Sequence, residues 1–538
     1  MFEDKTLRTI FFIVAIFAVV VYFAGLSIDV TRDAGKYATV SKEIFQNGNI
    51  INLTIHGDAY DQKPPMLFWL GAIGFAIGGI SNFWFKLPVL LLVFAGFYWA
   101  YQLGKSLYSK RVGYLTAIML GFSFIYTLYS SDIHTDTPLQ AFVTLALWQL
   151  SEFIKTRKHK HWIFGFIGIG LAMLSKGPIG AAIPGFAVIG HLVLKKQFRF
   201  LFDYRWFAGI VLAFVVASPA LIGLMNQFGW KGIWFFFWEN NVGRITGSYV
   251  KASNDPFYYF HNILYLFLPW SLLFFISAFL EFKTLIKNRF HSNEFFTFTG
   301  IWIFFIILNS ASSQLPNYVF SIVPLIAVLT AKWTDIALER KSKILVVFSR
   351  TQQFIVIVTW LMILIIAIYL FPSPKFIYWI IAAAGIVLTI ILFIRTKDNM
   401  SRLILPTIIS FTCFTLLINT HVLPYMFSFQ APPKAARFYN SNANENEKLY
   451  NYNYGQYELF FYSEPQALQI DKTEKPEDFL TKGSWIFTNP AGLDTLNMLD
   501  LKPDTIIEYK HLYLNSPSDF FNPKNRDKAL KPMYLLKY

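Results

Sequence analysis

The sequence predicts an α-helical polytopic membrane protein with a small C-terminal α/β domain. Of the 538 residues, 55% are hydrophobic and only 15% are charged, which is more apolar than a soluble protein of this length. Apolar segments of membrane length recur between residues 9 and 420. From about residue 421 the composition changes, because Asn, Asp, Glu, Lys and Pro replace the apolar runs. These three observations divide the chain into a membrane domain, 1–420, and a polar domain, 421–538.

The first candidate span is residues 9–27, an uncharged run of 19 residues. A membrane-crossing helix needs about 20 residues. A cleavable signal peptide is the alternative, but no small-residue cleavage site follows this run and many further apolar segments do. With the twelve segments that follow, we expect about 13 transmembrane helices. The further spans are predicted at 86–104, 112–129, 137–153, 161–174, 178–194, 206–225, 259–280, 295–309, 317–332, 352–371, 377–394 and 403–420.

Residues 66–82 are also apolar, but the distribution of basic residues indicates a helix lying on the membrane surface. With this segment at the interface, six loops share the side of the N-terminus, and each carries three to five Lys or Arg residues. The short loops on the other side carry none or one. The positive-inside rule makes the basic side cytoplasmic. An odd number of spans then places the C-terminal domain in the periplasm of a bacterium, and the protein in its inner membrane. The six basic loops are 105–111, 155–161, 195–205, 281–294, 332–350 and 395–402.

The net charge of +15 is explained by this orientation signal, so no nucleic-acid partner is needed. Anionic lipid headgroups are the natural partner of the basic loops. The only cysteine, Cys413, lies in the last span, which excludes an intramolecular disulfide and argues against thiol chemistry.

Two long external loops and the tail carry the remaining polar sequence. Residues 28–85 form the first loop, with a helix expected from Ala38 to Phe45 and a turn at Asn47-Gly48-Asn49. Residues 226–258 form the second loop, rich in Trp, Phe, Asn and Gly. In the tail, strands are predicted at Lys448 to Tyr454, Ser484 to Phe487, Thr505 to Tyr509 and Met533 to Leu536.

Asp33, about six residues beyond the first span, is the first candidate catalytic residue. Lys36 and Tyr37 follow three and four residues later, on the same face of a helix. A carboxylate, a cation and a phenol together can bind a hydroxyl-bearing acceptor and a phosphate. An ordinary loop acid or helix cap is the alternative, and spacing alone does not choose between Asp33 and Asp29.

Asp136, in the short loop before the span at 137–153, is the second candidate catalytic residue. Pro138 opens the helix that follows, so capping of that helix is an equally good explanation. The series Asp132, His134, Asp136 also has the composition of a metal site. With the spacing of a strand the three side chains could converge, whereas in a helical loop they would not, so a divalent metal stays an alternative but is not indicated. We therefore assign no cofactor and no metal ligand.

Four basic residues are candidates for binding a donor phosphate: Lys36, Lys63, Lys176 and Arg244. Lys63 precedes two prolines at headgroup depth, where snorkelling of the side chain is the common alternative. Lys176, in Ser175-Lys176-Gly177-Pro178, is almost the only basic residue in the short external loops. A cation that departs from the orientation rule is a good candidate for holding an anionic leaving group.

Aromatic and acidic residues near these cations are candidate substrate contacts. Glu239 lies five residues before Arg244, and Tyr318 follows the segment Ser313-Gln314-Leu315-Pro316-Asn317. Tyr37 completes this group. An interfacial aromatic belt is the alternative for the tyrosines.

Taken in order, these motifs resemble the bacterial aminoarabinosyltransferases, a branch of the glycosyltransferases that use lipid-linked sugars, with the protein O-mannosyltransferases as relatives. The resemblance covers roughly residues 10 to 325. The motifs are Asp-x-x-Lys-Tyr, Lys-Pro-Pro, Thr-Asp-x-Pro-Leu, Lys-Gly-Pro, Glu-x-x-x-x-Arg and Pro-Phe-Tyr-Tyr with Leu268-Pro269-Trp270-Ser271.

The resemblance implies the C-type glycosyltransferase fold, an external active site and a polyprenyl (undecaprenyl) phosphate sugar donor. By position, the family's two aspartates fall on Asp33 and Asp136, and its phosphate-binding residues fall on Lys36 and Lys63. The family often has Glu and Lys where this chain has Gln62 and Gln314. These departures put metal binding in the first loop in doubt and point to a different acceptor or donor head group.

Three functions compete at this point. A glycosyltransferase acting on lipid A, another glycan or a protein hydroxyl is favoured, because the notable charges lie at one interface. A transporter or flippase would place ionisable residues near the middle of the membrane. A structural protein with a periplasmic sensing domain is the third. The sequence identifies neither the sugar nor the acceptor, and it leaves the oligomeric state and the role of the C-terminal domain open.

Overall fold

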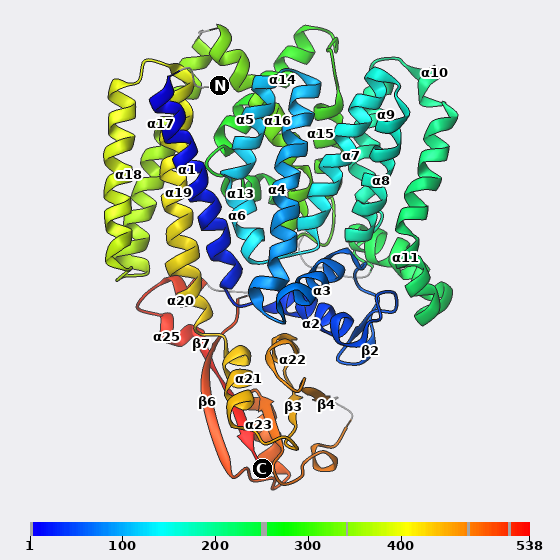
Figure 1. Cartoon of the computed structure of the whole chain (residues 1–538), viewed down its shortest axis with the longest axis vertical. Coiled ribbons are helices and arrows are strands. Elements are labelled where there is room, and N and C mark those ends of the chain that lie inside the picture. Colours follow the sequence, from blue (N-terminus) through cyan, green and yellow to red (C-terminus); the bar gives the residue numbers. More distant parts are fainter. Residues whose placement is uncertain (1–3, 249–254, 341–342, 471–473, 515–517) are drawn as a thin grey trace.

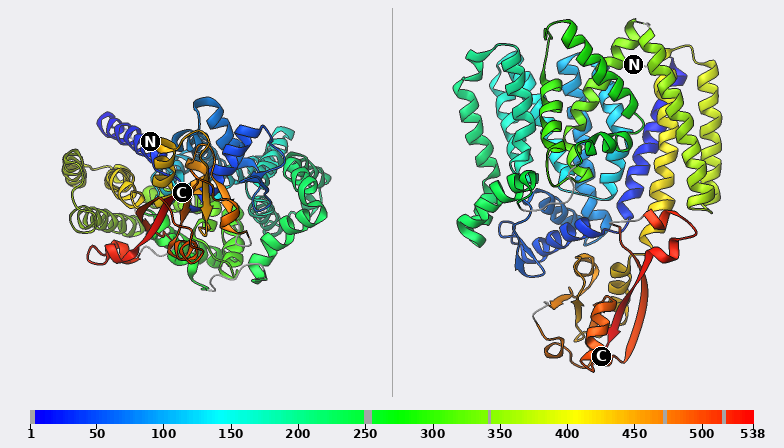
Figure 2. Two further views of the ribbon diagram at one scale, coloured as in Figure 1. Left: turned by 90° about the horizontal axis from the view of Figure 1, so that it is seen from below. Right: turned by 180° about the vertical axis from the view of Figure 1, so that it is seen from behind.

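The computed structural model describes residues 4–248, 255–340, 343–470, 474–514 and 518–538. A bundle of long helices forms one lobe, and a smaller lobe with a β-sheet hangs from one end of it (Figure 1). The N-terminal helix begins at the end of the bundle opposite to the small lobe, which contains the C-terminus (Figure 2). This arrangement is the one expected of a membrane domain followed by a polar α/β domain.

The bundle is built from helices that run roughly along its long axis. They are α1 (Lys5–Ala24), α4 (Asn82–Leu107), α5 (Lys110–Gly121), α6 (Phe124–Ser131), α7 (Asp136–Thr156), α8 (His159–Lys176), α9 (Ile179–Leu194), α11 (Tyr204–Trp234), α13 (Tyr258–Leu266), α14 (Ser271–Lys287), α15 (Phe296–Asn309), α16 (Val323–Arg340), α17 (Lys343–Ile365), α18 (Phe376–Arg395) and α19 (Asn399–Leu417). Shorter helical segments connect or extend them: η1 (Gly25–Ser27), α10 (Phe198–Leu201), η2 (Phe235–Val242), α12 (Gly243–Thr246), η3 (Pro316–Ile322), η4 (Ile366–Leu370), η5 (Ile418–Val422) and α20 (Leu423–Phe427).

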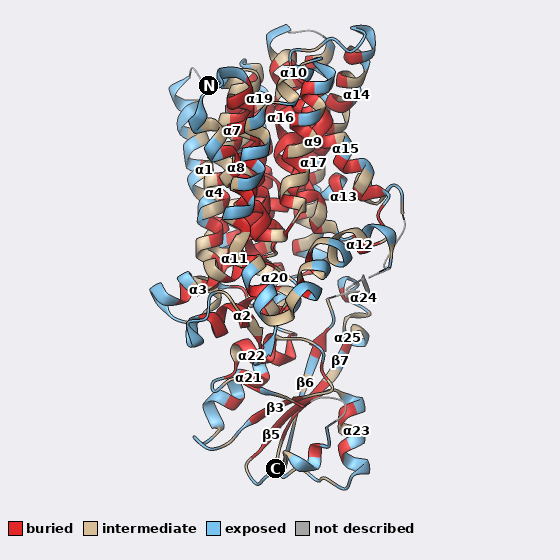
Figure 3. Ribbon diagram, turned by 90° about the vertical axis from the view of Figure 1, so that its right-hand side faces the viewer, coloured by how far each residue is buried: buried red, intermediate tan, exposed pale blue. Residues whose placement is uncertain are grey.

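Seven of the described helices are long and apolar enough to span a membrane, or eight if α5 and α6 form one bent span. The protein is therefore a multi-pass membrane protein. Each of the thirteen predicted spans falls on one helix or on a consecutive pair, but their number stays a prediction. Buried residues gather in the middle of the bundle, and outer helices such as α1 carry many exposed residues (Figure 3). The exposed residues of α1 include the apolar Phe12, Ile13 and Ile16, as expected for contact with lipid.

Two predicted spans are broken rather than continuous. The segment 112–129 is divided between α5 and α6, which meet at an angle of 49°. The segment 259–280 is divided between α13 and α14, on either side of Leu268-Pro269. Proline lacks the amide hydrogen that a continuous helix needs, so the break at Pro269 has a local cause.

A layer of short elements separates the bundle from the small lobe. Helix α2 (Arg32–Asn47) and helix α3 (Met66–Gly78) lie across the end of the bundle (Figure 1). Between them, β1 (Thr54–Ile55) and β2 (Asp58–Ala59) form an antiparallel hairpin that the sequence analysis missed. The predicted turn at Asn47-Gly48-Asn49 is confirmed, since Gly48 ends α2 with φ of +70°. The crosswise position of α3 agrees with the predicted interfacial helix.

The small lobe contains a five-stranded sheet of order β4-β3-β5-β7-β6. Its strands are β3 (Leu449–Tyr452), β4 (Leu468–Ile470), β5 (Trp485–Thr488), β6 (Thr505–Leu512) and β7 (Leu530–Lys537). Strand β3 is parallel to β4 and β5, whereas β7 is antiparallel to β5 and β6. All four predicted strands are confirmed. Its helices are α21 (Ala431–Asn442), α22 (Glu458–Tyr462), η6 (Pro476–Asp478), α23 (Pro490–Met498), α24 (Ser518–Phe521) and α25 (Arg526–Ala529).

Candidate active site

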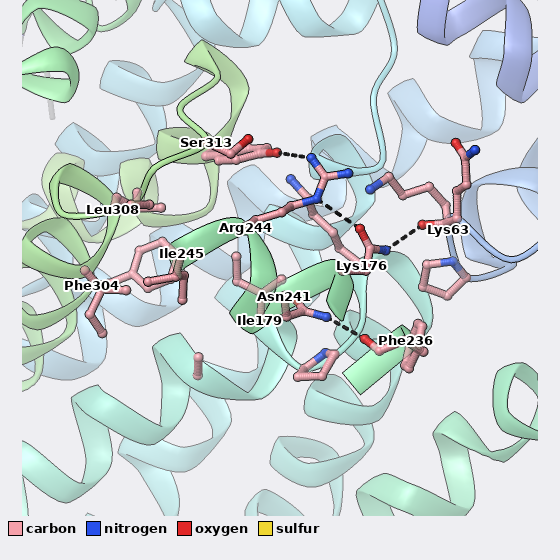
Figure 4. A pocket seen from close by; sticks show the side chains of 18 of the residues that line it. Lys63, Lys176, Ile179, Phe236, Asn241, Arg244, Ile245, Phe304, Leu308 and Ser313 are labelled. Atoms are coloured by element: carbon pink, nitrogen blue, oxygen red, sulfur yellow. Dashed lines mark hydrogen bonds between the residues drawn. The ribbon is translucent and has the colours of Figure 1, made fainter. Parts of the chain in front are cut away.

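A cavity of about 240 Å³ lies where the loop before α3 meets the ends of α8, η2 and α12. Basic side chains lie on one side of this cavity, while Phe304 and Leu308 of α15 lie on the other (Figure 4). Its polar lining residues are Gln62, Lys63, Lys176, Asn240, Asn241, Arg244, Ser313 and Tyr318. Its main apolar lining residues are Ile179, Ala182, Phe186, Phe236, Ile245, Phe304, Ile307 and Leu308. The cavity therefore suits a ligand that has an anionic group and an apolar portion.

Lys176, the last residue of α8, is held by a buried carboxylate. Its Nζ donates to Oδ1 and Oδ2 of Asp136 at 2.6 and 2.7 Å, and Asn317 donates its side-chain amide to the same carboxylate at 2.7 Å. The ammonium also lies 4.1 Å from the centre of the Tyr318 ring. Only 1% of the Asp136 side chain is exposed. Both carboxylate oxygens are thus occupied by this cluster of Asp136, Lys176 and Asn317.

The turn after Lys176 requires glycine. Gly177 has φ of +79°, a left-handed conformation that other residues rarely adopt. A Cβ atom at this position would also lie 3.0 Å from the ring of Phe236, which lines the cavity. The motif Ser175-Lys176-Gly177-Pro178 therefore ends α8 with its lysine at the cavity and begins α9 directly afterwards.

Lys63 and Arg244 bring two further cations to the same cavity. Burial, reinforced by the neighbouring charges of Lys176 and Arg244, lowers the pKa of Lys63 to about 7. The Arg244 guanidinium donates to Asn240 at 3.0 Å and to the hydroxyl of Tyr318 at 3.2 Å. A group with negative charge between these side chains would relieve their mutual repulsion.

Asp33 and Lys36 lie at the edge of this site, on the first turn of α2. Their side chains are 3.8 Å apart, and 48% of the Asp33 side chain is exposed. Lys36 Nζ donates to Oε1 of the cavity residue Gln62 at 3.1 Å. Burial lowers the pKa of Lys36, whereas the charge of Asp33 opposes that change. The Lys36–Gln62 hydrogen bond links the first-loop acid to the cavity.

Three other residues singled out in the sequence lie outside the cavity lining. Tyr37 is buried, with its ring 5.8 Å from the ring of Phe68. Glu239 is exposed. Asp29, the alternative to Asp33, forms an ion pair with Arg437 of the small lobe and accepts a hydrogen bond from Asn82. Of these two candidate acids, Asp33 is the one connected to the cavity, through Lys36 and Gln62.

The series Asp132, His134, Asp136 does not converge on one point. His134 Nε2 lies 3.2 Å from Asp132 Oδ2, whereas the Asp136 carboxylate forms an ion pair with Lys176. The Asp132 carboxylate counteracts the effect of burial and raises the pKa of His134. Among the residues that the structure describes, no group of three or more His, Cys, Asp or Glu side chains is arranged to hold a metal ion.

The sequence analysis missed the contributions of two asparagines. Asn317 holds Asp136, and Asn240 bridges Arg244 and the backbone carbonyl of Gln62, the latter at 2.9 Å. Both lie within motifs that the sequence analysis quoted. An asparagine next to a candidate cation or aromatic residue was the available signal, but the sequence alone does not give the partner.

Comparisons with known proteins identify the fold. The family of dolichyl-phosphate-mannose-protein mannosyltransferases matches residues 62–222. The computed structure superposes on the crystal structure of ArnT from Cupriavidus metallidurans bound to undecaprenyl phosphate, with a TM-score of 0.73, 18% sequence identity and 97% of each chain covered. The chain has the fold of ArnT. The predicted resemblance and the C-type glycosyltransferase fold are thereby confirmed.

Curated sequences extend the likeness to ArnT-type enzymes. An uncharacterized protein of Aquifex aeolicus is 27% identical over 351 residues, which cover 62% of this chain and 65% of that protein. The undecaprenyl phosphate-alpha-4-amino-4-deoxy-L-arabinose arabinosyl transferase 2 of Proteus mirabilis is 25% identical over 342 residues, covering 62% of this chain and 61% of the relative. The chain thus spans somewhat less than two thirds of the length of these relatives. The family match over residues 62–222 includes the cavity residues Gln62, Lys63 and Lys176.

Proposed function

We propose that this protein is an integral-membrane glycosyltransferase that moves a monosaccharide from a polyprenyl phosphate donor to an acceptor. The cavity carries this proposal, because Lys63, Lys176 and Arg244 meet at one side of it while apolar residues such as Phe304 and Leu308 line the other. A phosphodiester with an isoprenoid tail has the complementary distribution of charge and apolar surface. The similarity to ArnT, whose structure contains undecaprenyl phosphate, supports the same donor class.

Space for the isoprenoid tail is available next to this site. A second cavity of about 420 Å³ is lined by apolar residues of α8, α9 and α11, and Pro178 lines both cavities. Phe207 of α11 lines this cavity and is exposed, so it would face lipid. Burial of each additional methylene group contributes about 0.8 kcal/mol, so a long tail would add strongly to binding.

The proposed chemistry is a single displacement at the anomeric carbon of the donor. The acceptor oxygen forms a bond to this carbon while the bond from the carbon to the phosphate oxygen breaks. Asp33 takes the proton of the acceptor hydroxyl. The three cavity cations stabilise the negative charge that develops on the departing polyprenyl phosphate, and Lys36 supports them through Gln62. The sugar inverts its configuration in such a step.

Asp136 has a different task in this proposal. Its carboxylate is buried and bonded to Lys176 and Asn317, so it holds the Lys176 ammonium in place rather than accepting a proton. Tyr318 contributes to the donor site through its contacts with Lys176 and Arg244. Tyr37 and Glu239 remain proposals as substrate contacts, with no lining role in this cavity.

The proposed location is the bacterial inner membrane, with the N-terminus in the cytoplasm and the small lobe in the periplasm. Helix α3, which follows the cavity residues Gln62, Lys63 and Pro64, lies at the end of the bundle next to the small lobe and away from the N-terminus (Figure 1). The acceptor would then be a periplasmic lipid such as lipid A, another glycan, or a protein hydroxyl. The transporter alternative lacks this support, because the cations gather at one end of the bundle.

Binding of undecaprenyl phosphate to the purified protein tests the donor site directly. The wild-type protein in lipid nanodiscs should bind this lipid, and a variant with Lys63→Met, Lys176→Met and Arg244→Met should not. Lys375→Met is the matched control, since Lys375 is exposed before α18 and lies outside the described lining of the cavity. Equal binding by the wild-type protein and the triple variant would remove the donor site.

Mass spectrometry of envelope lipids and glycoproteins tests the reaction. A deletion strain should lack one sugar modification, which the wild-type gene restores and Asp33→Asn does not. Movement of a lipid-linked sugar across liposome membranes without its cleavage would favour the transporter instead.

A further inference from the structure

The small lobe packs against α2, the helix that carries Asp33 and Lys36. Helix α22 of the small lobe packs directly against α2, below the end of the bundle (Figure 1). The two helices are separated by more than 400 residues in the sequence, as the contact of Glu458 with Arg32 shows. The contacts reach both ends of α22, the side chain of Lys36 and the residue before Asp33.

Glu458 holds the start of α2. Its carboxylate accepts a hydrogen bond from the backbone N–H of Arg32, the residue before Asp33. Only 1% of Glu458 is exposed, and burial raises its pKa to about 7. A Cβ atom on Gly35 would lie 2.9 Å from Cγ of Glu458, so glycine permits this close approach. Arg32 itself has φ of +51°, a conformation that its surroundings must hold.

Tyr457, the residue before Glu458, reaches the side chain of Lys36. The Lys36 ammonium lies 5.2 Å from the centre of the Tyr457 ring. The backbone carbonyl of Tyr457 accepts a hydrogen bond from the Thr39 hydroxyl at 3.2 Å. On its other side the ring stacks on His56 of the hairpin, with ring centres 6.1 Å apart. Tyr457 thus limits where the Lys36 side chain can go.

Lys42 of α2 binds the C-terminal end of α22. Its buried ammonium donates to the backbone carbonyls of Phe460 and Phe461 at 3.1 Å and of Ser463 at 2.7 Å. These are the carbonyls that the end of a helix leaves without partners, and a cation there is favourable. Helix α22 is therefore fixed on α2 at both of its ends.

The segment before α2 is fixed to the same lobe. Asp29 forms its ion pair with Arg437 of α21. The hydroxyl of Tyr462 accepts a hydrogen bond from the backbone N–H of Val30 at 2.7 Å and donates to Asn82 at 2.7 Å. Residues 29 to 32, which lead directly to Asp33, are thus bonded along their length.

We propose that the small lobe is a positioning element of the active site, in which Glu458 and Tyr457 set the orientation of Asp33 and Lys36 toward the cavity. The proposal rests on the proposed function in assigning Asp33 and Lys36 to the reaction. It gives the small lobe a role in the transfer step itself. Glu458 and Tyr457 act through α2, so they are positioning residues.

Two substitutions at Glu458 test this role. Glu458→Gln keeps an oxygen that accepts the Arg32 N–H, whereas Glu458→Leu removes it. We expect Glu458→Leu to lower kcat about a hundredfold, because a displacement of about 1 Å at a reacting group has such an effect. The donor KM should change less than threefold, since the cavity cations are on other elements. Glu458→Gln should keep at least a third of the wild-type kcat.

Glu447→Leu is the matched control for damage confined to the small lobe. Glu447 bonds to the Trp485 indole at 2.6 Å and to Lys537 at 3.0 Å, both in the sheet. This variant should lower the thermal stability of the small lobe more than it lowers kcat. Equal activity of Glu458→Leu and the wild-type protein would overturn the proposal. A parallel loss of kcat in Glu458→Leu, Glu458→Gln and Glu447→Leu would also overturn it.

A readout independent of the reaction separates this proposal from the proposed function. With Asp33→Cys in a Cys413→Ala background, a charged thiol reagent reports how accessible position 33 is. Adding Glu458→Leu should change the labelling rate at least threefold, and adding Glu458→Gln or Glu447→Leu should not. If the wild-type protein transfers no sugar but this pattern is observed, the proposed function fails and the positioning contact stands. If the rate is the same in all variants, the positioning contact is absent.

Discussion

The two aspartates at the site begin their helices in the same way but lie in opposite environments. Asp33 is in the first turn of α2, and Asp136 is in the first turn of α7. Nearly half of the Asp33 side chain is exposed, and its closest cation is 3.8 Å away. Asp136 is buried, with Lys176 and Asn317 bonded to its oxygens. The comparison teaches that the same residue type, in the first turn of two helices, can lie accessible to a substrate or be fixed by its neighbours; in the proposed function these are the base and the anchor.

The largest expected effect is that of Asp33→Asn. Asparagine keeps the shape of the side chain but cannot accept the acceptor proton, so kcat should fall about 10²- to 10⁴-fold. The affinity for the donor should stay within twofold of the wild-type value, because the phosphate is held by the cavity cations and not by Asp33. Single-turnover transfer and equilibrium binding of undecaprenyl phosphate measure the two quantities. Wild-type kcat in this variant would assign the base to another residue.

Asp136→Asn should weaken donor binding more than Asp33→Asn does. The substitution removes the charge that pairs with Lys176, and a hydrogen bond to a charged group contributes about 1.5–3 kcal/mol. The donor KM should therefore rise roughly 10- to 100-fold, because the Lys176 ammonium is no longer held at the cavity. The Tm should also fall, since a buried cation loses its partner. An unchanged KM and Tm with a large loss of kcat would instead make Asp136 a direct participant like Asp33.

The pH dependence of donor binding tests the contribution of a cavity cation, Lys63. The pKa of Lys63 is lowered to about 7, so the ammonium is present below pH 7 and is lost above it. A phosphodiester keeps one negative charge over this range. Donor affinity should therefore fall about three- to tenfold between pH 6.5 and 8.5, with proton uptake on binding above pH 7. Lys63→Arg should abolish this slope, which calorimetry in buffers of different ionisation enthalpy can measure. A slope that persists in Lys63→Arg belongs to another group.

The features of the fold and of the site that depend on local sequence were predictable. The four predicted strands lie on short runs rich in apolar and aromatic residues, such as Trp485 to Phe487. The lysine before Gly177-Pro178 departs from the charge rule of its side. Strand β4 was missed because its three residues are too few to show a period. The break at Pro269 was missed because the apolar run continues through it.

The partners of the site residues were not predictable, since they come from distant parts of the chain. Asn317 is 181 residues from Asp136. Glu458 is 426 residues from Arg32, and nothing in its local sequence distinguishes it from a surface glutamate. A single sequence gives the residue types and predicts the side of the membrane, but the pairing of side chains needs the packed structure.

The smallest effects are expected from two neighbouring residues of η2, which provide a matched pair. Asn240 accepts from Arg244 at 3.0 Å and donates to the Gln62 carbonyl at 2.9 Å. Asn240→Ala should raise the donor KM about fivefold, the effect of roughly 1 kcal/mol for a lost hydrogen bond. Glu239 is exposed and outside the cavity lining, so Glu239→Ala should leave kcat and KM within twofold. A larger effect of Glu239→Ala than of Asn240→Ala would show that bound substrate extends beyond this cavity to the outer face of η2, and Glu239 would then join Asp33 as a free carboxylate of the site.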